Sequence, residues 1–295
     1  MIFISGCVGF EDPFGFISPK TEVKEQPPDV ISIQNINVLP PSPVIAGDQF
    51  SVSFELSNVE EERDVNVDYK LMDDGLCSLE SGVDSETFED FVPGRVEFVE
   101  WTFNSPSNEE IGYLRTTCPI RFIIGYQFTA ISDIEANVIT ENRYLQLQQS
   151  GEFATFKPTL NVGRGPIKIY IDYGASLPIR TERVLPVYIT VQDKGTGLLK
   201  EVPQNALKII IPEGFGLAED SNSCGERFTC NGSSCSNTED SLTMIKRESP
   251  TIKCSFTTPN EGNVVLERTY FITASLDYGY NLTQKIDVEV QPLEA

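Results

Sequence analysis

The sequence predicts an all-β protein: two tandem immunoglobulin-like antiparallel β-sandwiches that follow an extended N-terminal tether. Three observations predict it. Apolar and polar residues alternate along several segments, turn residues interrupt these segments at short intervals, and the alternating pattern occurs twice along the chain. No comparable stretch shows the 3.6-residue period of an amphipathic helix. The chain has 295 residues, of which 40% are apolar, so it can bury a core in each of two domains.

The first residues are Met-Ile-Phe-Ile-Ser-Gly-Cys, and residues 3–7 resemble a lipobox, in which small residues precede a cysteine that becomes lipidated. Signal peptides place about 7–15 apolar residues before such a site, whereas only Met-Ile-Phe-Ile precedes this one. We therefore expect residues 1–7 to be the remainder of a signal sequence whose translation starts upstream, and Cys7 to carry the lipid. The alternative is a frayed apolar terminus with a free thiol.

Residues 8–29 combine charges and prolines without any periodicity, which predicts a semi-extended tether. The apolar Phe14, Phe16 and Ile17 fit a tether less well and are candidates for docking on a partner. No later stretch approaches the roughly 18 apolar residues of a transmembrane helix.

The body of the chain contains an internal repeat. At a constant offset of 135, the alternating residues Phe50, Val52, Phe54 and Leu56 match Leu185, Val187, Ile189 and Val191. At an offset of 152, residues 120–128 match residues 272–280, and between these segments 101–106 aligns with 254–259. The offset grows where the second copy holds a cysteine-rich insertion. The repeat predicts an acidic first domain at 30–158 and a second domain at 159–295.

Segments 43–58 and 185–197 resemble the immunoglobulin-like modules of archaeal surface proteins, including the cell-adhesion-related (CARDB-like) and S-layer-associated domains. The resemblance covers most of 30–292, and its motif is a strand followed by an Asn/Asp-Gly turn. It implies a surface structural or adhesive protein with no shared catalytic residues, and with the lipobox it fits an archaeal surface lipoprotein.

Seven cysteines cannot all pair, and setting Cys7 aside leaves six. Cys77 and Cys118 are the only two in the first domain, so we expect them to pair. In the second domain the repeat favours Cys224–Cys254 with Cys230–Cys235, and Cys224–Cys235 with Cys230–Cys254 is the open alternative. Disulfides indicate an oxidising compartment, and the glycosylation sequons at Asn231 and Asn281 agree with export.

Metal binding is not expected. The cysteine spacing C-x5-C-x4-C-x18-C lacks the C-x2-4-C knuckle of structural zinc sites. The acidic runs at 60–62, 73–74 and 84–90 could suit calcium, but they contain no spaced EF-hand loop, so a solvated acidic face is the simpler interpretation.

Charge and composition exclude several functions. The net charge is −22, of which residues 1–150 contribute −18 and residues 151–295 contribute −4, so binding to a nucleic-acid backbone is not expected. The chain has no histidine, which removes the histidine-dependent catalytic and metal constellations. Trp101 is expected in a core. We expect no enzymatic activity and no cofactor.

These observations predict a non-enzymatic cell-envelope protein, anchored by Cys7 to the outer face of the cytoplasmic membrane, with a structural or adhesive role among other envelope proteins. One alternative is a subunit of a surface filament in which an N-terminal apolar segment adds a strand to a neighbour's sheet. A further alternative is capture of an extracellular solute.

Overall fold

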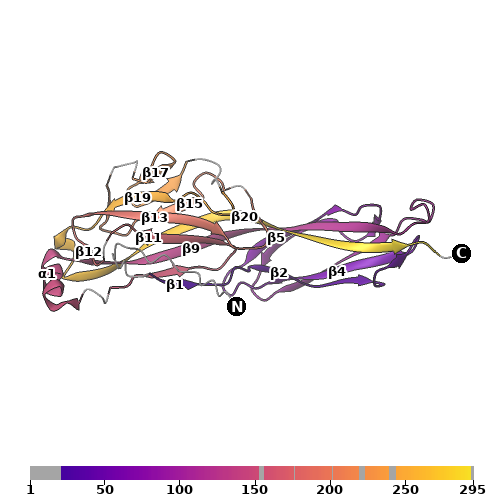
Figure 1. Ribbon diagram of the computed structural model, residues 1–295, viewed down its shortest axis with the longest axis horizontal. Coiled ribbons are helices and arrows are strands. Elements are labelled where there is room, and N and C mark those ends of the chain that lie inside the picture. Colours follow the sequence, from indigo (N-terminus) through magenta and orange to yellow (C-terminus); the bar gives the residue numbers. More distant parts are fainter. Residues whose placement is uncertain are drawn as a thin grey trace, which may run out of the picture.

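The computed structural model describes residues 21–152, 156–175, 177–200, 202–218, 223–238 and 244–293, and it confirms the all-β class. The molecule is elongated, and two long strands run through most of its length (Figure 1). The described part of the chain also contains one α-helix, α1 (Glu141–Ser150), and a short 3-10 helix at Glu261–Asn263.

Three sheets build the structure. One four-stranded sheet has the order β2 (Ile31–Leu39), β4 (Gln49–Asn58), β8 (Val96–Asn104), β6 (Ser78–Ser81). A second has the order β11 (Ile167–Tyr173), β13 (Val184–Asp193), β19 (Ile252–Thr257), β16 (Gly216–Leu217). We call the part of the molecule around the β2 sheet the first half and the part around the β11 sheet the second half.

The third sheet has 12 strands and extends through both halves. Its two long strands are β9 (Thr116–Ile139) and β20 (Glu267–Gln291). Its shorter members are β1 (Glu22–Glu25), β3 (Val44–Ile45), β5 (Val65–Asp73), β7 (Ser85–Phe91), β10 (Thr159–Val162), β12 (Ile179–Arg180), β14 (Leu198–Leu199), β15 (Leu207–Ile210), β17 (Phe228–Asn231) and β18 (Ser234–Asn237).

The two long strands pair with each other along almost their whole length. β9 and β20 are antiparallel over 24 consecutive pairs, from Glu267 opposite Ile139 to Val290 opposite Thr116, without a register shift. The repeat offset of 152 maps Gln127 onto Gly279, and these two residues are themselves partners in the ladder. The two copies are therefore related by a pseudo-two-fold axis that passes between Gln127 and Gly279.

Two short parallel pairings obey the same symmetry. Val44 of β3 lies opposite Val290 at the end of β20, and its repeat counterpart Ile179 of β12 lies opposite Val138 at the end of β9. Each copy of the repeat thus pairs its short strand with the end of the other copy's long strand. The first part of β9 lies in the first half and its last part in the second half, and β20 runs the opposite way.

The expected division at 158/159 separates two long strands that pair with each other. Residues 267–291, assigned from sequence to the second domain, form a ladder with residues 116–139, assigned to the first. The segment after residue 158 forms β10, which pairs with both β9 and β1. The described end of the expected tether likewise contains β1, and residues 1–20 lie outside the described residues.

Helix α1 corrects the expectation that strands make up the whole body. Thr140 caps it by accepting a hydrogen bond from the backbone N–H of Arg143 on its side-chain oxygen, and Gly151 ends it in the left-handed conformation. Leu147 is its one buried residue, so the segment has no apolar stripe from which the sequence could predict a helix.

The alternating residues form the core. In the first half, Phe54 of β4 stacks on Phe122 of β9 with ring centroids 4.4 Å apart, and Trp101 of β8 packs 5.2 Å from each. Trp101 is fully buried, as expected, and its indole N–H donates to the carbonyl oxygen of Val83 at 2.7 Å. The β2 sheet and the long sheet therefore pack face to face as a sandwich.

Candidate functional site

The pseudo-two-fold axis is surrounded by four buried aromatic residues. Tyr126 lies opposite Tyr280, and Phe128 lies opposite Tyr278, with ring centroids 5.7 and 6.3 Å apart. The symmetry exchanges these two pairs, because the offset of 152 maps Tyr126 onto Tyr278 and Phe128 onto Tyr280. Burial raises the pKa of all three tyrosines far above the usual value, so they are neutral hydroxyls. We call this region the junction.

Polar contacts brace the second-half side of the junction. The Asp193 carboxylate accepts hydrogen bonds from the Tyr280 hydroxyl at 2.9 Å and from Arg247 Nη2 at 2.8 Å. Arg247 also donates to the carbonyl oxygens of Gly195 and Gly197. The sequence repeat pairs Asp193 with Asn58, which accepts from the Glu60 N–H just as Asp193 accepts from the Gly195 N–H. Both strands thus end in the same kind of turn.

A second set of contacts joins the two halves directly. Arg164, which follows β10, donates to the carbonyl oxygen of Val59 at 2.8 Å and to the Glu61 carboxylate at 2.6 Å. Its Nε lies 3.6 Å from the carboxylate of Glu60, which is 5% exposed. Arg63 donates to the carbonyl oxygen of Thr129 and lies 4.0 Å over the Phe128 ring. The junction is therefore held by charged hydrogen bonds as well as by aromatic packing.

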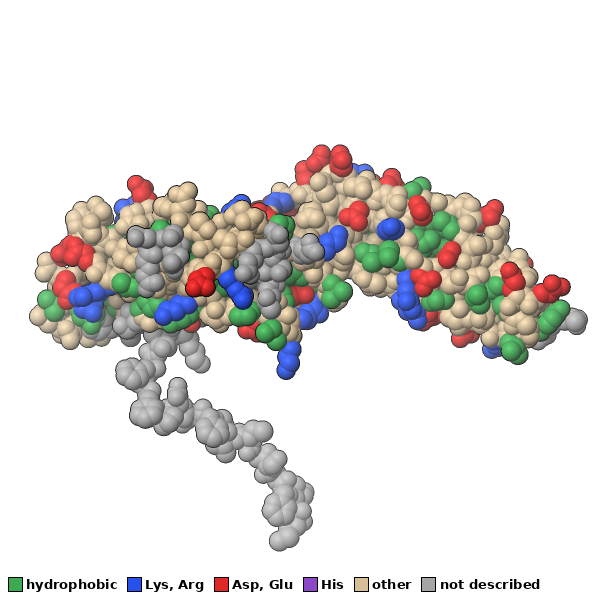
Figure 2. All heavy atoms as spheres, turned by 90° about the horizontal axis from the view of Figure 1, so that it is seen from above, with side chains coloured by type: hydrophobic (Ala, Val, Ile, Leu, Met, Phe, Trp, Pro, Cys, Tyr) green, Lys and Arg blue, Asp and Glu red, His purple; other side chains and the backbone are tan. Residues whose placement is uncertain are grey.

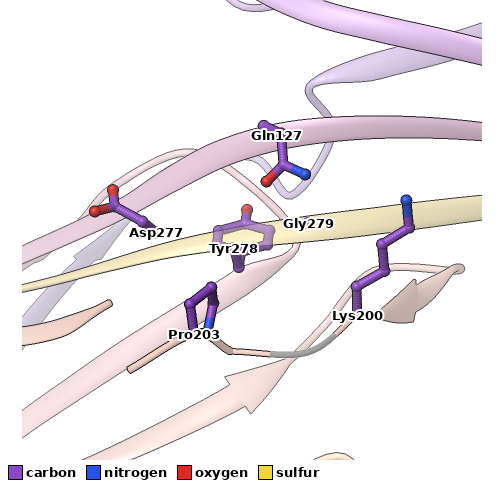
Figure 3. Close-up of a pocket in the computed structure, with 6 residues that line it drawn as sticks. All are labelled: Gln127, Lys200, Pro203, Asp277, Tyr278 and Gly279. Carbon is purple, nitrogen blue, oxygen red and sulfur yellow. The ribbon is translucent and has the colours of Figure 1, made fainter. Parts of the chain in front are cut away.

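A hollow of about 560 Å³ lies beside the junction. Figure 3 shows its lining: Gln127 from β9, Asp277, Tyr278 and Gly279 from β20, and Lys200 and Pro203 from the segment that follows β14. Gly279 leaves little room, because a Cβ there would lie 3.1 Å from both the Gln127 amide nitrogen and the Lys200 side chain.

The described lining of this hollow offers hydrogen-bonding groups and two single charges. Asp277 accepts a hydrogen bond from the Thr129 hydroxyl at 2.7 Å and lies 3.7 Å from Lys208. Lys200 contributes a cation to the same lining. The hollow can hold a small polar group, but Asp277 is the only carboxylate in its described lining, so it has no facing pair for acid-base work.

Lys168 is a buried cation that no sequence motif indicated. It lies on β11 between Ile167 and Ile169, and its ammonium group donates to the carbonyl oxygens of Gln26 at 2.6 Å, Gly163 at 2.8 Å and Pro27 at 3.3 Å. Burial lowers its pKa to about 8, and the nearby Glu25 opposes this shift. Lys168 thus fixes the segment after β1 to the second half.

Arg164, Arg247 and Lys168 each join segments that are far apart in the sequence, and composition alone could not reveal these contacts. Several of their acceptors are backbone carbonyls, such as those of Val59, Gln26 and Gly197. An alternating segment that contains one lysine, such as Ile167-Lys168-Ile169, is the one available signal.

All six cysteines of the folded part are buried and paired. The disulfides are Cys77–Cys118, Cys224–Cys254 and Cys230–Cys235, which are the pairings that the repeat favours. The Sγ atoms of Cys224, Cys230 and Cys235 lie within 4.8 Å of one another, and this is the only group of potential metal ligands that converges within the described residues. Each of these sulfurs is already engaged in a disulfide.

Most residues of the acidic runs are exposed, and Glu60 is the buried exception. Glu60 is buried against Arg63 and Arg164, Asp73 caps the Gly75 N–H, and Glu86 accepts from the Tyr69 hydroxyl. Burial and this contact with Glu86 raise the pKa of Tyr69 to about 12. Figure 2 shows acidic side chains distributed along both halves of one face, with Lys and Arg among them.

The remaining predicted sites fall in different environments. Asn231 is exposed at the end of the β17–β18 hairpin, whereas Asn281 is half-buried in β20 opposite Leu198. Cys7, Phe14, Phe16 and Ile17 lie outside the described residues. Among the residues described, no helix is long and apolar enough to cross a membrane.

Comparisons with known proteins give no family. No family model and no curated protein match the chain. Similar solved structures include a red sea bream transglutaminase, with 10% identity over 88% of this chain and 31% of that chain and a TM-score of 0.17. They also include the B domain of a biofilm-associated protein, with 8% identity over 92% of this chain and 87% of that chain and a TM-score of 0.14. The chain spans about a third of the transglutaminase, and scores this low carry no argument about fold or function.

Proposed function

We propose that this protein is a non-enzymatic, lipid-anchored element of the cell envelope, in which two immunoglobulin-like sandwiches form a stiff spacer that presents surfaces to other envelope proteins. The continuous β9–β20 ladder is the observation that carries the proposal. A ladder of 24 pairs runs through the junction where tandem domains would have a flexible linker.

The side chains around the ladder support the same role. Aromatic pairs, the Arg164 contacts with Glu60 and Glu61, and the Asp193–Arg247 pair all restrain bending at the junction. Three buried disulfides fit an oxidising environment outside the cytoplasm. Cys7 would supply the anchor, and residues 8–20 would supply the reach to the first strand.

Mass spectrometry of the protein purified from native membranes tests this proposal. We expect an N-terminal peptide that begins at Cys7 and carries a diacylglyceryl-type group, and we expect protease added to intact cells to digest the protein. An unmodified Cys7 thiol, or protection until the cells are lysed, would overturn the anchored, outward-facing assignment.

Assembly into a filament is a second candidate, favoured by a specific observation. Within the described residues, no strand pairs with one edge of β20 in the first half, whereas β10 covers the symmetry-related edge of β9 in the second half.

A further inference from the structure

We propose that the outward edge of β20 at residues 283–287 accepts an extended strand from a second copy of this chain, and that residues 14–18 of that copy supply it. The inference rests on the proposed function as an envelope component and names the surface and the partner through which copies would join.

The edge offers free backbone groups. Outward from β20, Gly279 accepts from the Lys200 N–H, Asp277 donates to Ala206, and Glu289 donates to the Ser42 hydroxyl. Backbone direction alternates along a strand, so the N–H and C=O groups of Thr283, Lys285 and Asp287 also point outward. Within the described part of the chain, no strand pairs with them. Such an edge is a template for strand addition.

The pseudo-two-fold symmetry shows which element covers the equivalent edge in the second half. The symmetry counterparts of these three residues are Ile131, Asp133 and Glu135 of β9, and this edge is covered by β10. Asn161 lies opposite Asp133, and the Gly163 N–H donates to Ile131. By the repeat offset of 135, the first copy's counterpart of β10 is residues 24–27. The last two residues of β1, Lys24 and Glu25, fall in this segment, but β1 pairs in parallel with β10 in the second half.

The inner face next to the edge is correspondingly less buried than its symmetry counterpart. Leu282 and Ile286 are half-buried, whereas their counterparts Ala130 and Ile134 are buried. On the facing strand β2, Ile36 is 43% exposed. A hollow of about 200 Å³ lies beside the junction where β2 and β20 meet. Its lining includes Ile31 and Ile33 of β2 and Leu282 and Gln284 of β20, together with Pro28, Asp29 and residues of the junction. We call this space the open seam, and it can take apolar side chains from an added strand.

Residues 14–18, Phe-Gly-Phe-Ile-Ser, have a matching pattern. In β10 the inward residues Leu160 and Val162 are two apart, and both are buried. Phe14 and Phe16 are also two apart, so a strand would direct both rings into the open seam and leave Gly15 facing outward. Two phenylalanines left in a solvated tether contribute no burial energy, whereas their burial in the open seam would stabilise the complex between two copies.

The segment cannot reach the open seam of its own chain. Glu22 lies beside Thr159, at the level of Glu135, whereas Lys285 lies opposite Arg121, about 14 residues or roughly 48 Å farther along β9. Phe16 precedes Glu22 by six residues, which span at most about 21 Å when fully extended. The donor must therefore come from another molecule, and repeated donation would produce a head-to-tail filament.

The experiment uses the full chain with a photo-reactive phenylalanine analogue in place of Phe16. We expect a cross-link to residues of β2 or β20 around the open seam, in a covalent dimer. In equilibrium sedimentation, Phe14→Asp with Phe16→Asp should weaken self-association at least tenfold, and Asp12→Asn, in the same segment, should leave it unchanged.

The acceptor is tested separately. Lys285→Pro removes one outward N–H and no ladder hydrogen bond to β9, so we expect the variant to fold, judged by its circular dichroism, and to lose self-association. A synthetic peptide of residues 11–20 should bind the Phe14→Asp/Phe16→Asp chain and should not bind that chain when it also carries Lys285→Pro.

A cross-link within one chain, a cross-link elsewhere, or no peptide binding would overturn the proposal. Acylation at Cys7 and surface exposure are measured in separate experiments. The proposed function and the strand addition between copies can therefore fail independently of each other.

Discussion

Arg164 in the second half lies against Glu60 in the first half, with its Nε 3.6 Å from a carboxylate oxygen that is buried in the junction. Removing one partner of a buried ion pair leaves the other charge buried and unpaired, and the resulting loss of stability reaches about 3–5 kcal/mol. Arg63 remains near Glu60, so we expect Arg164→Met to lower the free energy of unfolding by about 2–3 kcal/mol. Urea titration followed by the fluorescence of Trp101, the only tryptophan, measures it.

Glu61 provides the matched control, because it contacts the same arginine but is 78% exposed. We expect Glu61→Gln to cost less than about 1 kcal/mol. Equal losses in the two variants would contradict a buried brace at Glu60.

The exchange of long strands predicts how the halves behave when separated. A fragment of residues 159–295 would keep the β11 sheet but lose the β9 partner of β20, so we expect it to be unfolded or to form dimers through β20. Fragments 1–158 and 159–295, expressed together in the same cells, should form a one-to-one complex. Size-exclusion chromatography with light scattering would detect this, and a folded, monomeric 159–295 fragment would instead support two independent tandem domains.

Lys168 predicts a pH dependence. Its pKa is about 8 in the folded protein, against an ordinary value of 10.5, so the unfolded chain binds more protons between these values. Stability therefore rises with pH across that window as the cost of the buried charge disappears. Other groups titrate in this window too, so the measured quantity is the difference in the free energy of unfolding between wild type and Lys168→Met. We expect this difference to move in favour of wild type from pH 8 to 10.5. A constant or falling difference would show that the ammonium group is fully compensated by its three carbonyls.

Peptide mapping without reduction checks the cysteine connectivity. We expect links between Cys77 and Cys118, between Cys224 and Cys254, and between Cys230 and Cys235. The Cys77→Ser/Cys118→Ser double variant should lose about 2–4 kcal/mol, because the bond closes a loop with a sequence separation of 41. A link between either of these cysteines and the later four would contradict the structure.

The sequence predicted most of the strands and both copies of the repeat, because alternation of Phe50, Val52, Phe54 and Leu56 depends only on which side of a sheet each residue faces. It could not predict the exchange of β9 and β20. A strand that folds back on its own sandwich and one that crosses into the other bury the same alternating residues, so the pattern is identical in both cases.

The junction was missed for a related reason. Arg164 and Lys168 contact residues more than 100 positions away, and many of their acceptors are main-chain oxygens that every residue type provides. Helix α1 was missed because its one buried residue, Leu147, leaves no periodic signal.

The axis between Gln127 and Gly279 has a consequence for how the molecule assembles. A chain with only one copy of the repeat could complete the same ladder only as a homodimer, and its folded fraction would then fall on dilution. Joining the copies through residues 140–158 turns that encounter into an intramolecular one at a high effective concentration. The protein can therefore fold as a single molecule however scarce it is at the place where it works.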